Sequence, residues 1–122
     1  MKEIKAYIRP ELLETTIKHL EEEGAEDITV IRVDALGALA DYEDDRRHII
    51  RKYNEKYSKI AKLEIVCRDE EAEGFMKIIQ KHAYVGEPGD GRIFLSQVLR
   101  AIKIRTGEQD EEALCDCNLP AK

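Results

Sequence analysis

The order of amphipathic segments constrains this fold most, because a strand–helix–strand pattern occurs on each side of a long charged connector. Residues 2–9 alternate apolar and polar side chains, as a half-buried strand does. Pro10 ends that run and is suited to the first turn of a helix. Residues 11–23 place apolar side chains at helical spacing, and Gly24 follows as a C-terminal cap. The β-branched run 28–33 predicts a second strand.

The second half of the chain repeats this pattern. Residues 60–67 alternate as a strand does, residues 70–82 form an amphipathic helical pattern, and residues 92–105 are mostly strand-forming. Two such units, with both helices on one face of an antiparallel sheet, predict an α+β fold of ferredoxin-like type, a βαββαβ sandwich. The length of 122 residues suits one domain. We expect this domain to span residues 1–114 and residues 115–122 to form a flexible tail.

Composition and charge exclude several classes of protein. The formal net charge of -6 argues against a nucleic-acid-binding surface, which needs a basic excess to neutralise phosphates. No apolar run approaches the ~20 residues that cross a bilayer, and the N-terminus lacks the apolar stretch of a signal peptide. We therefore expect a cytoplasmic protein without membrane insertion.

The three cysteines do not form a disulfide framework or a complete four-ligand zinc set. Cys67 ends an apolar run and is predicted to be a small core residue. Cys115 and Cys117 stand in the polar tail, either as a redox-sensitive or soft-metal pair or as solvent-exposed residues. The connector also holds an acidic cluster that is either a cation site or a solvated face. Its residues are Asp41, Glu43, Asp44, Asp45 and His48.

The strongest local signal for chemistry is the turn Gly89-Asp90-Gly91 followed by Arg92. Glycines permit positive φ, so successive amides in such a turn can form an anion-binding nest, and Arg92 would add a charge-assisted hydrogen bond. The alternative is an ordinary tight turn that leads into a strand.

Two further basic residues stand near the end of the predicted last strand. Lys103 and Arg105 are two positions apart, so on a strand they would project from one face. Together with Arg92 they would supply three positive charges for a polyphosphate. The alternative is that both residues are solvated surface.

In the order and spacing of these motifs, the chain resembles the PII family of signalling proteins. Residues 89–95 and 102–108 resemble the family's C-terminal signature. Residues 1–10 look like its opening strand, and residues 28–30 and 62–66 also match. The resemblance extends to about Leu114 and fails in the long loop and the tail.

The resemblance implies a homotrimer that binds an adenine nucleotide in clefts between subunits. The matching positions are Ile8, Thr29, Gly37, Ala38, Val66, Gly89, Asp90, Gly91, Arg92, Lys103 and Arg105. In the family the glycine turn and the two late basic residues reach the phosphates, and the positions of Thr29 and Val66 meet the adenine. The positions of Ile8 and Gly37 line the cleft. Residues of about 36–58 correspond to the T-loop, which docks onto partner proteins.

The base of this loop departs from the family pattern. Ala38 and Leu39 stand where classical members have an arginine and a glutamine. Each lost charged hydrogen bond weakens binding by about 1.5–3 kcal/mol, so we expect ADP or AMP to compete well with ATP. Magnesium-linked 2-oxoglutarate sensing is not expected. Tyr53 lies near the position that is nucleotidylated in nitrogen-regulating members, but its neighbours do not match that motif, so an unmodified loop tyrosine is the alternative.

The expected function is therefore that of a divergent PII-like regulator without a resident cofactor, metal or catalytic residue. It would respond to ADP, AMP or ATP, with bicarbonate as a candidate second ligand, and act through its T-loop on a transporter or metabolic enzyme. The alternatives are a slow nucleotide hydrolase and a metal-binding trimer of the CutA type, which shares the fold. We find no nucleophile with a partner base in the sequence, which argues against the hydrolase.

Overall fold

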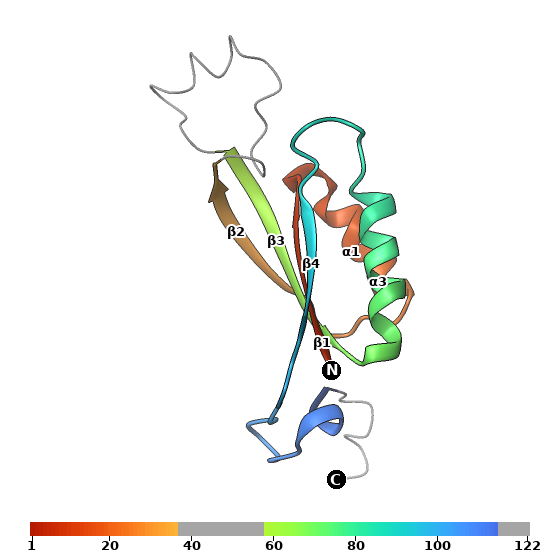
Figure 1. Cartoon of the computed structure of the whole chain (residues 1–122), viewed down its shortest axis with the longest axis vertical. Helices are drawn as coiled ribbons and strands as arrows, with labels where there is room; N and C mark the ends of the chain where they lie inside the picture. Colours follow the sequence, from red (N-terminus) through yellow and green to blue (C-terminus); the bar gives the residue numbers. More distant parts are fainter. Residues whose placement is uncertain (37–57, 115–122) are drawn as a thin grey trace.

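The computed structural model describes residues 1–36 and 58–114, which form one antiparallel sheet with two helices on one of its faces (Figure 1). The strands are β1 (Lys2–Ile8), β2 (Thr29–Ala35), β3 (Ser58–Cys67) and β4 (Arg92–Gln97). The α-helices are α1 (Leu13–Glu22) and α3 (Asp69–His82), and the 3-10 helices are η1 (Pro10–Leu12) and η3 (Asp110–Leu114). The strand order is β2-β3-β1-β4. This order of elements is that of a ferredoxin-like α+β fold, as predicted.

The core lies between the sheet and the two helices because the strands alternate as their sequences indicate. In β1 the side chains of Ile4, Ala6 and Ile8 are buried, whereas those between them are partly exposed. The helices contribute Leu20, Phe75 and Ile79, among others, to the same core. Cys67 is also a buried core residue, which confirms the prediction from sequence.

The other face of the sheet carries polar and aromatic side chains. Lys62 lies 2.9 Å from the Glu64 carboxylate, and its Nζ is 5.6 Å from the centroid of the Tyr7 ring. Tyr7 also makes an edge-to-face contact with Phe94 on β4, at a centroid distance of 6.1 Å. This face is therefore of mixed character, unlike the apolar face that the helices cover.

The predicted strand over residues 92–105 is too long. In β4, Arg92 pairs with Tyr7 and Gln97 pairs with Lys2. The last bond of this ladder joins the Val98 amide to the Met1 carbonyl. Because β1 starts there, the later strand-forming residues have no neighbouring strand among the described residues, and β4 ends.

A small turn replaces the rest of the expected strand. An isolated bridge joins Ile102 to Gln109, and Gly107 has a φ of 77° in the turn between them. In Figure 1 this segment and η3 lie at the opposite end of the sheet from the loop that precedes β4. Within residues 1–36 and 58–114, the structure contains no helix long and apolar enough to cross a bilayer.

Candidate functional site

The loop between α3 and β4 is shaped by glycines in the left-handed region of backbone space. Gly86, Gly89 and Gly91 have φ values of 92°, 98° and 95°. Gly91 is constrained further, because a Cβ atom there would lie 1.7 Å from the Tyr7 carbonyl oxygen. The loop backbone can therefore approach β1 this closely only with glycine at position 91.

Asp90 holds the loop together through its carboxylate. Its Oδ2 accepts hydrogen bonds from the amides of Val85 and Gly86, at 3.0 and 2.9 Å. Partial burial on its own would raise the pKa of Asp90, but these two amides and the Arg9 guanidinium outweigh it and lower that pKa below its ordinary value. Asp90 therefore shapes the turn as a carboxylate.

Arg9 is the residue of this site that sequence reasoning missed. Its Nε lies 3.1 Å from Asp90 Oδ1, and its Nη2 donates to the Pro88 carbonyl oxygen at 2.9 Å. The guanidinium thus ties the loop to the end of β1. An arginine before a proline gives no sequence signal for a partner 81 positions away, so only the folded structure reveals this contact.

Several predicted site residues do gather around one cavity. Ile8, Asp90, Gly91 and Arg92 line a cavity of about 250 Å³, together with residues from the last turn of α3 and the exposed Tyr84. Gly89 lies in the same loop. Of the predicted site, Ile8 and the turn from Gly89 to Arg92 therefore lie together within one chain.

The remaining described residues of the predicted site lie elsewhere. Thr29 begins β2, the opposite edge strand from β4, so three spacings of about 4.8 Å separate these edges. Val66 lies near the end of β3, opposite Glu3, where it lines a second cavity. The adenine-side residues therefore do not meet the glycine turn within one chain.

The prediction that Lys103 and Arg105 lie on the last strand is wrong. They do not project from one face of a strand, because Lys103 follows the bridge at Ile102 and Arg105 lies in the turn. Lys103 Nζ lies 3.6 Å from Glu108 Oε1, and Arg105 is exposed. Arg92 opens β4 while these two cations follow its far end, so the three positive charges do not gather within a single chain.

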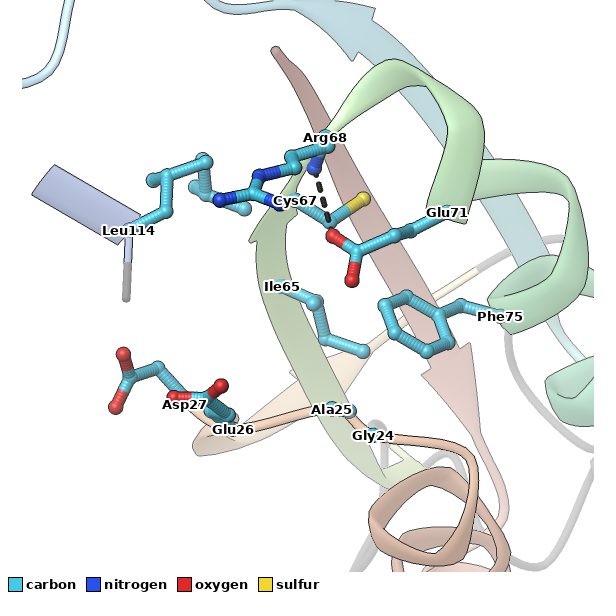
Figure 2. A pocket seen from close by; sticks show the side chains of 11 residues that line it. Gly24, Ala25, Glu26, Asp27, Ile65, Cys67, Arg68, Glu71, Phe75 and Leu114 are labelled. Carbon is cyan, nitrogen blue, oxygen red and sulfur yellow. Dashed lines mark hydrogen bonds between the residues drawn. The ribbon is translucent and has the colours of Figure 1, made fainter. Parts of the chain in front are cut away.

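The second cavity, of about 280 Å³, is shown in Figure 2. It is lined by the loop after α1, the end of β3, the first turns of α3 and Leu114 of η3. The Arg68 amide donates to Glu71 Oε1 at 3.0 Å at its rim. Burial, followed by the nearby Glu71 carboxylate, raises the pKa of the Cys67 thiol to about 11, so this thiol is protonated at neutral pH and a poor nucleophile.

Other predicted features lie outside the described residues. These are Gly37, Ala38, Leu39, Tyr53, Cys115, Cys117 and the acidic cluster Asp41, Glu43, Asp44, Asp45 and His48. Among residues 1–36 and 58–114, no three histidine, cysteine or carboxylate side chains gather in a way that could hold a metal ion.

The fold and the ordered motifs define a small α+β domain of ferredoxin-like topology, with a glycine turn at one end of its sheet. A family model described as Nitrogen regulatory protein P-II matches residues 1–108. The chain therefore belongs to the P-II family of signalling proteins, which confirms the resemblance seen in its sequence.

Individual relatives agree with this assignment. Nitrogen regulatory protein P-II 2 of Methanothermobacter thermautotrophicus (strain Delta H) is 39% identical over 114 residues, which cover 93% of this chain and 97% of that protein. Nitrogen regulatory protein GlnK of Escherichia coli (strain K12) is 32% identical over 93% of this chain and 100% of its own length. Nitrogen regulatory protein P-II of Rhizobium meliloti (strain 1021) is 35% identical with the same coverage.

Proposed function

We propose that this protein is a homotrimeric sensor that binds an adenine nucleotide between neighbouring subunits and regulates a transporter or metabolic enzyme through residues 36–58. Each cleft takes Ile8 and the turn from Gly89 to Arg92 from one subunit. The next subunit provides Thr29, Val66, Lys103 and Arg105. Gly37 and Ala38 complete the first half at the base of the long loop.

The separation of the two half-sites is the observation that carries this proposal. Arg92 is the first residue of β4 and the late basic pair follows the other end of this strand, so one ligand cannot contact both within one chain. Six strand residues at about 3.4 Å each already separate them by more than the length of a triphosphate tail. Head-to-tail contact in a closed ring brings one end of a subunit against the other end of its neighbour, which would reunite the charges.

Exposed apolar side chains support an assembly of this kind. Leu99, Ile102 and Ile104 are 82%, 60% and 99% exposed in the single chain, and they lie in the same segment as Lys103. Removal of apolar surface from water contributes about 25 cal/mol per Å², and this contribution offsets the entropy cost of association. A neighbouring subunit covering this segment would therefore bury apolar surface and hold the second half-site at the same time.

The ligand is expected to be ADP or AMP in preference to ATP, because Ala38 and Leu39 offer no charged or amide contact to a terminal phosphate. Bicarbonate beside the phosphates is a candidate second ligand, since Arg92, Lys103 and Arg105 would leave positive charge in the cleft. A nucleotide that contacts the base of the long loop would shift the balance between its conformations, by no more than its difference in affinity for them.

The test is a calorimetric titration of ADP into the wild-type protein and the Arg92→Ala variant. Loss of one charge-assisted hydrogen bond should weaken binding about tenfold or more. The matched control is Lys77→Ala, which removes an exposed cation from α3 and should leave the affinity unchanged. Equal affinity in wild-type and Arg92→Ala protein would remove the assigned site. Repeating the wild-type titration with bicarbonate tests the second ligand.

A further inference from the structure

Two histidines stack on each other where the two helices meet, outside the site described above. His19 of α1 and His82 of α3 have ring centroids 3.6 Å apart and an interplanar angle of 15°. Both side chains are half-buried. An imidazole titrates between pH 5 and 8, so this contact can change its charge within the physiological range.

The charges around the pair oppose a second proton on it, whereas its hydrogen bond to the backbone is compatible with either charge state. His19 Nδ1 lies 2.9 Å from the Thr15 carbonyl oxygen, which accepts a hydrogen bond from a protonated Nδ1. Partial burial, the neighbouring His19 and Lys81 lower the pKa of His82, and Glu22 of α1 opposes this shift. The second proton on the pair is therefore the unfavourable one, because it places two cations face to face.

His82 is also close in sequence to the loop that contains the glycine turn. It is the last residue of α3, and the helix is closed by the Ala83 amide, which donates to the Ile79 carbonyl at 2.9 Å. Further along the chain, the amides of Val85 and Gly86 bind Asp90 Oδ2. Only Ala83 and Tyr84 separate the stacked ring from the amides that shape the turn.

We propose that the His19–His82 stack is a proton-sensitive contact that couples acidification to weaker ligand binding at the glycine turn. When both rings carry a proton, their repulsion separates the end of α3 from α1 and displaces the amides of Val85 and Gly86 from Asp90. This inference rests on the proposed nucleotide site for its readout, although the helix contact itself can be tested without a ligand.

The direction of the pH effect follows from the lowered pKa of His82. An unfolded histidine titrates near 6.5, and the folded one holds its proton less tightly. The stability that the neutral stack contributes is therefore complete above about pH 6.5 and is lost as the pH falls through the lower, folded-state pKa. Neutral pH favours the ordered turn, and mild acid opposes it.

The experiment compares ADP affinity at pH 7.5 and pH 5.5 in the wild-type protein and in His82→Phe, whose ring still stacks on His19 but takes up no proton. The phosphate of the nucleotide titrates near pH 6 itself, so the difference between the two proteins is the readout. We expect the wild-type protein to lose at least about fivefold more affinity than the variant, the lower range of coupling between sites. Lys77→Ala, which removes an exposed cation from α3 and leaves both stacked histidines in place, should behave as wild type.

Each outcome separates this inference from the proposed function. If ADP binds at pH 7.5 and His82→Phe follows the wild-type pH dependence, the coupling is wrong and the nucleotide site stands. If ADP binds neither protein, the proposed function fails, and the contact is judged from the free energy of unfolding at both pH values. If acid lowers the free energy of unfolding of the wild-type protein, and lowers it less in both His82→Phe and His19→Gln, the contact is supported. An equal loss in all three proteins overturns it. His19→Gln also serves for the affinity test should His82→Phe fail to fold.

Discussion

At the scale of single residues, the backbone dictates the identity of Gly91 through two separate requirements. Its φ of 95° is unfavourable for any residue with a Cβ, and that Cβ would overlap the Tyr7 carbonyl. Gly24 shares only the first requirement, because its φ is 104° but a Cβ atom at this position would meet no atom within 4 Å. The two glycines therefore separate backbone strain from steric overlap.

We expect Gly91→Ala to lower the free energy of unfolding by clearly more than Gly24→Ala. Positive φ alone costs about 1–3 kcal/mol, and the overlap with β1 adds to this at position 91 because a backbone atom cannot move aside cheaply. Urea denaturation at one fixed protein concentration measures both losses. Equal losses in the two variants would mean that the loop shifts away from β1 without cost.

At the scale of secondary-structure elements, one ion pair joins the end of β1 to the loop before β4. Arg9 and Asp90 form this link, with side chains that are 13% and 24% exposed. An aspartate with a lowered folded-state pKa contributes stability above its ordinary value of about 3.9, and this contribution is lost as the pH falls through the folded pKa. The link should therefore hold at neutral pH and fail in strong acid.

Asp90→Asn tests this link, since the amide keeps the shape but loses the charge. Its free energy of unfolding should fall below that of the wild type at pH 7. The gap should begin to narrow as the pH falls below the ordinary aspartate value of about 3.9, and it should close only once the pH is below the lowered folded-state pKa of the wild-type carboxyl. Urea denaturation across this pH range measures the gap. Asp34→Asn is the control, because its pair with Lys59 is 51% and 82% exposed and should contribute little. A gap for Asp90→Asn that persists unchanged at pH 3 would contradict the role of the charge.

The elements also show how far the sequence alone could lead. The alternation of residues 2–9 and 60–67 predicted β1 and β3 because one face of each strand packs against the core and the other does not. The same reasoning extended the last strand to residue 105, since β-branched side chains do not reveal where the neighbouring strand begins. That limit is set by Met1, which is remote in sequence and adjacent only in the fold.

The candidate site was predictable to a similar degree. Glycine and aspartate types at 89–91 indicated the turn and its use of positive φ, and the structure has both. The contact of Arg9 with Asp90 depends on β1 and β4 being neighbours, which local sequence does not encode. The distance between Arg92 and Lys103 likewise follows only from the direction of β4.

At the scale of the whole molecule, the separated half-sites make a prediction about mixed oligomers. Arg92→Ala is designed to damage one proposed half-site, and the double variant Lys103→Ala with Arg105→Ala is designed to damage the other. If each cleft joins halves from two subunits, a mixed trimer contains clefts in which both halves are intact. Random assembly of equal amounts should restore about a quarter of the clefts in a closed ring.

The two variant proteins would be unfolded together, refolded as a mixture and titrated with ADP, beside each variant refolded alone. Each variant alone should bind at least about tenfold more weakly than the wild type, whereas the mixture should show a minority class of sites with wild-type affinity. Sedimentation should give about three times the 14.0 kDa chain mass in every sample, so that a lost assembly is not mistaken for a lost site. If both halves of a site belonged to one chain, the mixture would recover no wild-type affinity, because every chain would still contain one altered half.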